Sequence, residues 1–450
     1  KKVCGGLADS APGAGTTAFK KASSRERAPL AGLGFIRVGE DGKAYLTTKS
    51  EHYHLSVGHN FPGYRLVENA QKLGISNVTH NNTRGHVTRL LEQELVRIAN
   101  GIPRGDKDRL NQVLGSTEPH VLNRVLNLET GSLAVEAALK MVLARFYRFD
   151  ERSETPKYHG RTPVVLVIAD NIGGKKANYH GTTILTQIMR GAWPELAGVL
   201  EASNALVVRP VQINSIDDFE AALDEYDNGQ YKVAAFFHEI ILMNYGGIEL
   251  EEEYLQRAYA LCQERDVATV ADEIQSCIWS PELFLFREYH LRPVATIFCR
   301  RFPGGKYPAS RIITTAAMDD LNLFGALVTN GQEELASIAY LVTMEFAQAN
   351  SAYTREIGDY YEAELRAVAQ RYPDTVDAIE GRRHLSAVVF KSGEAASQFV
   401  GYLNKAGIDI SAQTYKVDCL PSALTKIPLI SSGKLVDFVI AKMDEALSRM

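Results

Sequence analysis

Five short apolar runs, rich in β-branched residues, recur along the middle of the chain and constrain its fold more than any other feature. Segments with helical spacing of apolar residues, such as Asp217–Tyr226 and Glu252–Asp266, lie between several of these runs. Strands that alternate with helices predict an α/β fold, with a mostly parallel sheet covered by helices on both faces. The runs are Val164–Ala169, Leu206–Val211, Val233–Phe237, Val267–Ala271 and Val294–Phe298.

Polar residues follow the last two runs at the point where each predicted strand ends. Asp272 and Glu273 come directly after the fourth run, while Arg300 and Arg301 follow the fifth and precede a Gly-Gly turn. Parallel strands end at a common edge, and open α/β sheets bind their ligands at that carboxyl edge. The sequence therefore predicts the functional site there.

Composition excludes several classes of protein. A net charge of −5 gives no reason to expect nucleic acid or an anionic membrane as a partner. No apolar run approaches the roughly 20 residues of a membrane span, and the N-terminus has no apolar core of a secretory signal. The cysteines are scattered without metal-binding spacing, which favours reduced thiols in a cytoplasmic protein and no metal site. They are Cys4, Cys262, Cys277, Cys299 and Cys419.

The chain of 450 residues is long enough for a large domain and a smaller one. We expect residues 1–30 to form a mobile extension, because they are rich in small and polar residues without a period. Residues 31–85 would join the small domain and begin with a hairpin around Asp41 and Gly42. Residues 86–330 would form the large domain, and residues 331–450 a small α+β domain.

Three isolated motifs have ordinary explanations when each is taken alone. Thr130-Gly131-Ser132 precedes a helical run, where free N–H groups can bind an anion, but it also fits a simple N-cap. The Tyr179-His180-Gly181 stretch could be only a loop, and Asp272 could only cap a local turn.

Together these motifs resemble class III (ω-) aminotransferases, which are fold-type I pyridoxal-phosphate enzymes. The likeness runs from Gly34 to the C-terminus and rests on the order of GHNFPGY, TGSLAVEAALK, NYHGTT, ADEIQS and GGKYPAS. It implies a large domain with a mostly parallel sheet plus a smaller α+β domain. It also implies small-molecule amino donors and keto acceptors, with no nucleic acid or membrane as partner.

The resemblance assigns roles around the cofactor ring. Asp272 would pair with the pyridinium nitrogen, so that the ring acts as an electron sink. Gln275 would contact the ring hydroxyl, and Tyr179 would stack on the ring with His180 beside it. Glu239 would be the active-site glutamate of the family.

It also assigns the residues around the cofactor phosphate. Thr130, Gly131 and Ser132 would hold the phosphate at a helix N-terminus. Thr329 matches the threonine that reaches the phosphate of the neighbouring subunit. That match implies a homodimer with composite active sites.

The chain departs from the family at the lysine that binds the cofactor covalently. Counting back from the Gly-Gly turn and Tyr307-Pro308 places that lysine at Arg300. A guanidinium stays protonated, with a pKa above about 12, so it can be neither nucleophile nor general base. Lys306 lies beyond the turn and is expected to be a surface lysine. Pyridoxal 5'-phosphate, pyridoxamine phosphate or an external aldimine adduct would then be bound without a covalent link.

Two explanations of Arg300 stay open. It could be an engineered Lys→Arg change that stalls a working transaminase, which the intact remainder of the pocket favours. It could also mark a natural, non-catalytic cofactor-binding pseudoenzyme. A decarboxylase on the same scaffold is a further alternative.

The substrate is predicted from a narrower resemblance. The stretch where related enzymes carry a carboxylate-binding arginine has Lys426 instead, so Arg84, with Asn82 beside it, is the candidate for substrate binding; a surface arginine is the alternative. THNNTRGH and FPGGKYPASR look most like the branch that contains 3-aminobenzoate synthase of antibiotic biosynthesis. That branch would imply amino transfer from L-glutamate to 3-dehydroshikimate, giving 3-aminobenzoate.

Overall fold

The computed structural model describes residues 1–22, 24, 26–49, 55–77, 83–169, 179, 181–299, 302–323, 325–328, 331, 333–414 and 419–450. Contacts divide the chain into two compact units, one of residues 66–351 and one of residues 1–65 with 352–450. We call them the large and the small unit. Within the part of the chain that is described, no helix combines the length and the apolar character needed to cross a membrane.

The large unit extends beyond the predicted limits of the large domain. Helix α12 (Glu334–Ala349), assigned above to the small domain, packs against α4 (His86–Ala99). The Glu334 carboxylate accepts hydrogen bonds from the Val87 amide at 2.9 Å and from the Thr88 hydroxyl at 2.9 Å. These bonds satisfy donors at the start of α4, so α12 is part of the large unit. The segment from residue 66 to residue 85 also belongs there.

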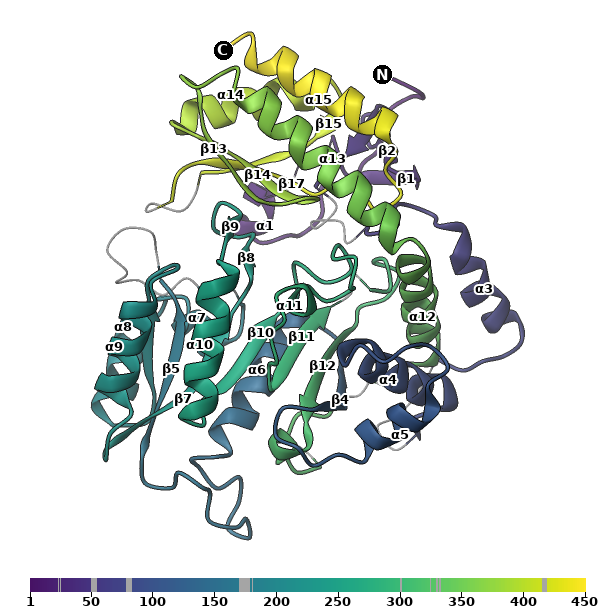
Figure 1. Ribbon diagram of the computed structural model, residues 1–450. Coiled ribbons are helices and arrows are strands. Elements are labelled where there is room, and N and C mark those ends of the chain that lie inside the picture. Colours follow the sequence, from purple (N-terminus) through teal and green to yellow (C-terminus); the bar gives the residue numbers. More distant parts are fainter. Residues whose placement is uncertain are drawn as a thin grey trace. The chain divides into compact units, whose positions relative to one another are not determined.

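A seven-stranded sheet forms the centre of the large unit, with the order β4-β12-β11-β10-β7-β5-β6 (Figure 1). All five predicted strands are present, while β4 and β12 were not predicted. β12 runs antiparallel to both of its neighbours, and the other adjacent strands pair in parallel. The strands are β4 (Leu122–Leu128), β5 (Thr162–Ile168), β6 (Val207–Val211), β7 (Tyr231–His238), β10 (Ala268–Asp272), β11 (Ala295–Cys299) and β12 (Ser310–Thr315).

The reversal at β12 follows from the short connection before it. A parallel crossover needs a dozen or more residues, usually with a helix. Here the chain passes from Cys299 to Ser310 through a turn at Gly304 and Gly305, whose φ angles are 56° and 74°. Glycine adopts such positive φ angles without steric cost, so the strand can return beside β11.

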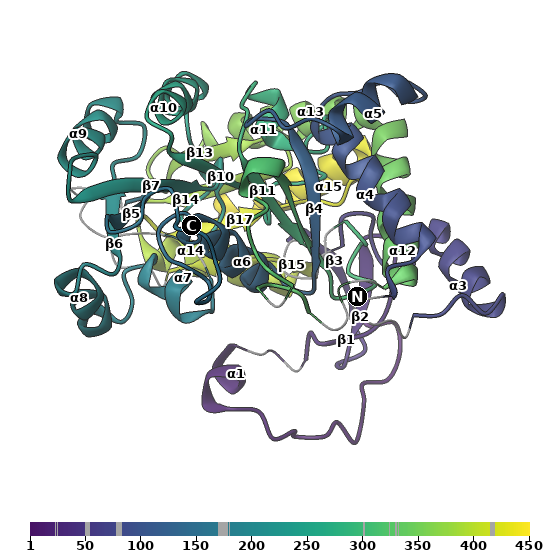
Figure 2. The same ribbon diagram turned by 90° about the horizontal axis from the view of Figure 1, so that it is seen from below.

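Helices cover both faces of the sheet. Figure 2 shows α9 and α10 on one face and α6, α7 and α8 on the other. Besides α4 and α12, the helices of this unit are α3 (Arg65–Lys72, whose first residue lies at the boundary), α5 (Lys107–Leu114), α6 (Gly131–Leu143), α7 (Ile184–Ile188), α8 (Pro194–Ala202), α9 (Ile216–Tyr226), α10 (Glu252–Glu264) and α11 (Leu285–Glu288).

Helix α6 is the buried helix of the large unit. It packs against β11 and β12, and its apolar side chains are almost fully buried in the main core cluster. A helix that is apolar on most sides is favoured only where protein surrounds it. The buried residues are Ala134, Val135, Ala137, Ala138, Leu139, Met141 and Val142.

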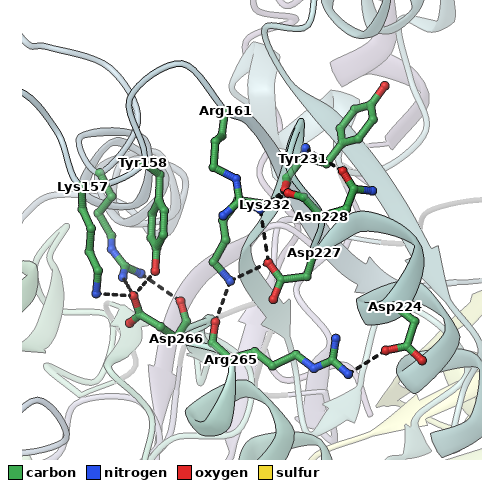
Figure 3. Close-up of polar contacts among 11 residues, drawn as sticks. Lys157, Tyr158, Arg161, Asp224, Asp227, Asn228, Tyr231, Lys232, Arg265 and Asp266 are labelled. Atoms are coloured by element: carbon green, nitrogen blue, oxygen red, sulfur yellow. Dashed lines mark hydrogen bonds and ion pairs between the residues drawn. The ribbon is translucent and has the colours of Figure 1, made fainter.

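A polar network fastens the segment after α6 to the sheet (Figure 3). The ring of Tyr158 has four cations around it, with distances to the ring centroid of 5.1 to 5.8 Å. Its hydroxyl donates to the carboxylate of Asp266, which also accepts from Lys157 at 2.7 Å. The cations are Arg145, Lys157, Arg161 and Lys232.

The small unit contains an antiparallel sheet with the order β13-β14-β17-β16. Helices α13 (Ser351–Ala369, whose first residue lies at the boundary), α14 (Gly393–Lys405) and α15 (Gly433–Leu447) supply the rest of its core. The predicted hairpin around Asp41 and Gly42 is confirmed as β2 and β3. The strands of this sheet are β13 (Val376–Arg382), β14 (Leu385–Phe390), β16 (Ser411–Gln413) and β17 (Ser422–Thr425).

A second sheet of the small unit, ordered β1-β2-β3-β15, pairs three strands from the N-terminal part of the chain with one strand from its C-terminal part. Its buried Asp409 carboxylate pairs with Arg37 at 2.6 Å, Arg27 at 3.0 Å and Lys49 at 3.4 Å. Residues 1–30 are not structureless, because they contain helix α1 (Thr17–Ala22) and the start of β1. The strands are β1 (Pro29–Leu33), β2 (Ile36–Gly39), β3 (Ala44–Thr47) and β15 (Ile408–Asp409).

Candidate functional site

The carboxyl ends of the parallel strands bring polar residues to one edge of the large sheet. Ala271 of β10 pairs with His238 of β7, so Asp272 and Glu239 follow at the same level. Asp272 in turn pairs with Ile297 of β11, two residues before that strand ends. This is the edge at which the sequence predicted the site.

Asp272 is one of the buried carboxylates of this edge, with 5% of its surface exposed. Its Oδ2 atom accepts a hydrogen bond from the Tyr179 hydroxyl at 2.5 Å, and its Oδ1 atom accepts one from the Ile274 amide at 2.9 Å. Two donors hold the carboxylate in one orientation. The group is therefore positioned to interact with a cation or a protonated ring nitrogen.

Tyr179 lies beside Asp272 and is itself buried. Burial, the charge and hydrogen bond of Asp272, and the charge of Glu239 raise the pKa of Tyr179 well above its ordinary value. The phenol is thus a neutral donor at any physiological pH. Its ring meets that of Phe237 edge to face, with centroids 6.0 Å apart. Tyr179 and Asp272 are therefore in direct contact, and the Glu239 charge lies near enough to affect the phenol.

The Thr130–Ser132 stretch forms the start of α6. Thr130 is the N-cap, and its side chain accepts a hydrogen bond from the Leu133 amide at 3.4 Å. Its carbonyl accepts a 2.7 Å bond from the hydroxyl of Ser310, at the start of β12. The Ser132 hydroxyl lies 2.7 Å from that of Thr182. These contacts hold the helix N-terminus at the same edge of the sheet as β12's first residue.

Ser310 and Thr182 are contacts of the site to which the sequence assigned no role. Both belong to quoted motifs, GGKYPAS and NYHGTT, but their roles depend on contacts with residues 180 and 50 positions away. Sequence spacing alone carries no signal of such pairs.

Glu273, the neighbour of Asp272, has a different environment. It is fully buried and accepts hydrogen bonds from the Ser276 hydroxyl at 2.6 Å and the Phe286 amide at 2.7 Å. Burial raises the pKa of Glu273 to about 7, despite these bonds. Its two bonds hold the turn after β10 in place, so we assign it a structural role.

The other predicted residues of the site that the structure describes differ in their exposure to solvent. Gln275 is half-buried after β10. Arg84 pairs with Glu92 at 3.6 Å, and 49% of its side chain is exposed. The Glu92 carboxylate also accepts from Asn127 on β4 at 2.7 Å, so this pair adjoins the end of β4. Lys306 is exposed, as predicted.

Lys426 belongs to the small unit, where it is fully buried after β17. Its amide bonds the Thr48 carbonyl at 2.6 Å. Asn82, His180, Arg300 and Thr329 lie outside the described residues. Predictions for those four positions rest on the sequence.

The described residues fit a phosphorylated pyridine. A buried carboxylate suits a ring nitrogen, while the α6 N-terminus with the Thr130 and Ser132 hydroxyls suits a phosphate. Gly131 lets Ile274 pack closely against the start of α6, because a Cβ at this position would lie 2.7 Å from Ile274 Cδ1. The donor set therefore matches the two polar ends of pyridoxal phosphate.

Comparison with known proteins agrees with this chemistry. Residues 28–429 match the aminotransferase class-III family. The chain is 25% identical over 279 residues to ornithine aminotransferase car2 of Schizosaccharomyces pombe, covering 61% of this chain and 56% of that protein. It is 23% identical over 416 residues to a diaminobutyrate–2-oxoglutarate transaminase of Vibrio cholerae, covering 89% of this chain and 92% of that one.

Solved structures agree on the fold. A transaminase from the marine bacterium Virgibacillus superimposes with a TM-score of 0.75 at 17% identity, covering 97% of this chain and 95% of that one. The fold is that of fold-type I pyridoxal-phosphate transferases, and pyridoxal 5'-phosphate is the cofactor of the matched family. The family match covers most of the sequence, so this chain belongs to the class III aminotransferases.

Proposed function

We propose that the chain binds pyridoxal 5'-phosphate at the carboxyl edge of the large sheet and has the scaffold of an amino-acid:keto-acid aminotransferase. The observation that carries the proposal is the buried Asp272 carboxylate at the end of β10, held by Tyr179. Asp272 would hold the ring nitrogen protonated, and Thr130, Gly131 and Ser132 would hold the phosphate. When bound, the cofactor supplies an electron-poor ring that stabilises negative charge on the substrate.

Arg300 decides how far the reaction proceeds. A guanidinium neither attacks a carbonyl carbon nor accepts a proton at neutral pH, so the chain lacks the nucleophile and the base of its relatives. Loss of a positioned general base alone commonly lowers the rate about 10²–10⁴-fold. We therefore propose a non-covalently bound cofactor and a stalled transaminase.

Borohydride reduction followed by mass spectrometry of the intact chain tests this proposal. The unaltered chain should gain no cofactor mass, whereas Arg300→Lys should gain one cofactor per chain and regain amino transfer. A stable adduct on the unaltered chain, for example at Lys306, would show that position 300 is not the family's lysine position. No cofactor binding by either chain would refute the proposal as a whole.

The second candidate function is a non-catalytic cofactor-binding protein, which Arg300 itself favours. Arg300→Lys separates the two functions. A chain that binds the cofactor covalently after this change, yet transfers no amino group from any donor, would be a pseudoenzyme scaffold.

For the substrate, we propose L-glutamate as donor and 3-dehydroshikimate as acceptor, giving 3-aminobenzoate. The support is the motif resemblance together with Arg84, whose side chain is 49% exposed. Its ion pair with Glu92 is long, at 3.6 Å, which suits a guanidinium that binds an acceptor carboxylate. Product analysis of Arg300→Lys with these substrates tests the assignment. Arg84→Gln should raise the KM of the acceptor and leave that of glutamate nearly unchanged.

We also propose a homodimer, because Thr329 corresponds to the threonine that reaches the cofactor phosphate of the other subunit. Such permanent interfaces commonly bury more than about 2,000 Å². Sedimentation of the cofactor-loaded chain at micromolar concentration should give a single dimeric species. A cofactor-loaded monomer would argue against the shared site.

A further inference from the structure

Cavities also lie at the opposite, amino edge of the large sheet. One of them has a volume of about 540 Å³ and lies where β10 and β11 begin. Its acidic and basic lining residues balance, so it offers little preference for a ligand of either charge. They are Arg145, Arg148 and Lys157 against Glu154, Asp266 and Asp320, with His120 at one side.

A neighbouring cavity has a volume of about 390 Å³. Every ionisable side chain of the described residues that line it is an arginine or a histidine. Its walls come from the end of α4, from α5, from the start of β4 and from the segment between α11 and β11. No Asp or Glu of the described residues lines it, although the chain as a whole has a net charge of −5. The basic and imidazole side chains are Arg109, His120, Arg287, His290 and Arg292.

Two of these arginines have no carboxylate partner in the part of the chain that the structure describes. Among the described residues, neither Arg109 nor Arg292 has an ion pair within 4.0 Å. Arg287 is paired with Glu282 at 3.1 Å, and 25% of its side chain is exposed. At least two guanidinium groups are thus available to a ligand. A planar guanidinium can donate two parallel hydrogen bonds to the oxygens of a phosphate or a carboxylate.

Burial lowers the pKa of two basic side chains that line the cavity, Arg287 and His120. Burial and the charge of Arg97 lower the pKa of Arg287, although Glu282 opposes this. Burial and the charge of Arg292 likewise lower the pKa of His120. Cations brought together without enough counter-charge repel each other, and an anion in the cavity would relieve that repulsion.

A smaller cavity of about 190 Å³ continues from this one and shares His120, His290 and Arg292 with it. Its further lining is uncharged and includes the polar side chains of Gln256, Tyr259, Gln263 and Thr269 beside the apolar Ala260, Val267 and Leu291. The two cavities together can hold a ligand that has an anionic end and a neutral polar part.

We propose that this basic cavity binds a small molecule through a phosphate or polycarboxylate group, at a site separate from the cofactor. Arg292 precedes β11, whereas the proposed cofactor residues follow the other ends of the strands. A strand of five residues separates two such points by roughly 17 Å. A ligand here should bind without displacing pyridoxal phosphate.

Calorimetric titration of the full chain, saturated with pyridoxal phosphate, tests the site with pyrophosphate and with citrate as probes. We expect at least one probe to bind, and Arg109→Gln and Arg292→Gln each to raise its Kd by about tenfold or more. Lys107→Gln is the matched control, because it removes a positive charge from the same helix, α5, outside the cavity. It should change the Kd less than about twofold. The probe that binds more tightly identifies the anionic group.

A variant that binds the probe more tightly gives a further test, because misfolding would weaken binding and not strengthen it. Glu282 competes for Arg287 and does not line the basic cavity, so Glu282→Gln should tighten binding severalfold. No binding of either probe at millimolar concentration would overturn the proposal. Equal weakening by Lys107→Gln would also overturn it, as would release of pyridoxal phosphate during the titration.

Discussion

The hydroxyl of Tyr179 donates a 2.5 Å hydrogen bond to the buried carboxylate of Asp272, across 93 positions of the sequence. The bond joins Tyr179, which follows β5 in the sequence, to the end of β10. It therefore fixes an aromatic ring and a carboxylate next to each other before any ligand arrives. The electrostatics of the proposed cofactor site depend on this pair.

Replacing Asp272 tests the charge of this pair. Asp272→Asn keeps the shape but removes the negative charge that would hold a ring nitrogen protonated, so the Kd for pyridoxal phosphate should rise about tenfold or more. Tyr179→Phe removes one donor and should have a smaller effect. Fluorescence titration with the cofactor measures both. An unchanged Kd for Asp272→Asn would place the ring nitrogen elsewhere.

Comparing variants of two N-cap residues tests the role of the α6 N-terminus. Thr130→Ala and Ser215→Ala each remove an N-cap hydroxyl, from α6 and α9 respectively, and each should lower the free energy of unfolding by about 1 kcal/mol. Only Thr130→Ala should also weaken binding of pyridoxal phosphate. If both changes weakened cofactor binding equally, lost stability rather than phosphate contact would explain the effect.

Acid sensitivity of the small unit should depend on His384. This side chain is fully buried, and neither ring nitrogen has a hydrogen-bond partner among the described residues. Burial, with the nearby charge of Arg383, lowers the pKa of His384 from 6.5 to about 3. The folded chain therefore resists protonation at this site, while the unfolded chain accepts it.

This difference in protonation sets the direction in which the free energy of unfolding changes with pH. As the pH falls from 6.5 toward 3, the free energy of unfolding should drop by up to about 1.4 kcal/mol per pH unit from His384. Denaturant unfolding of His384→Leu across this range should show a shallower pH dependence. His159→Leu, at an exposed position, should keep the steep pH dependence of the unaltered chain. Equal slopes for the two variants would contradict the prediction.

Asp266 should contribute to stability at neutral pH through the network around Tyr158. Burial alone would raise its pKa, but hydrogen bonds from Lys157 and Tyr158 and the charge of Arg145 lower it overall. Its contribution is therefore present above the ordinary pKa of 3.8 and is lost as the pH falls through the lowered value. The carboxylate is 48% exposed, so screening by water limits the effect.

Asp266→Asn should lower the free energy of unfolding at pH 7 by about 1 kcal/mol. Asp224→Asn is the control, because its pair with Arg265 has a carboxylate that is 70% exposed and should contribute little (Figure 3). Thermal unfolding of both variants at pH 7 measures the difference. Equal loss in the two would show that the network around Tyr158 adds nothing.

The sequence by itself determined the α/β class, the five parallel strands and the cap of α6. These features follow from local causes. Strand and helix periods repeat within a few residues, and Thr130 bonds an amide three residues later. The position of Asp272 at the end of a buried strand was readable for the same reason. The assignment of Arg300 to the family's lysine position rests on the sequence alone and stays a prediction.

Only the tertiary structure decided which distant segments meet. The insertion of β12 between β4 and β11, the packing of α12 on α4, and the bonds Tyr179–Asp272 and Ser310–Thr130 join residues that no local period connects. The basic cavity at the amino edge arises in the same way, from α4, α5, β4 and the segment after α11. The arginines of this cavity lie between Arg109 and Arg292 in the sequence. They become neighbours only when the strands of the sheet align, because contacts between distant residues depend on the packing of the whole unit.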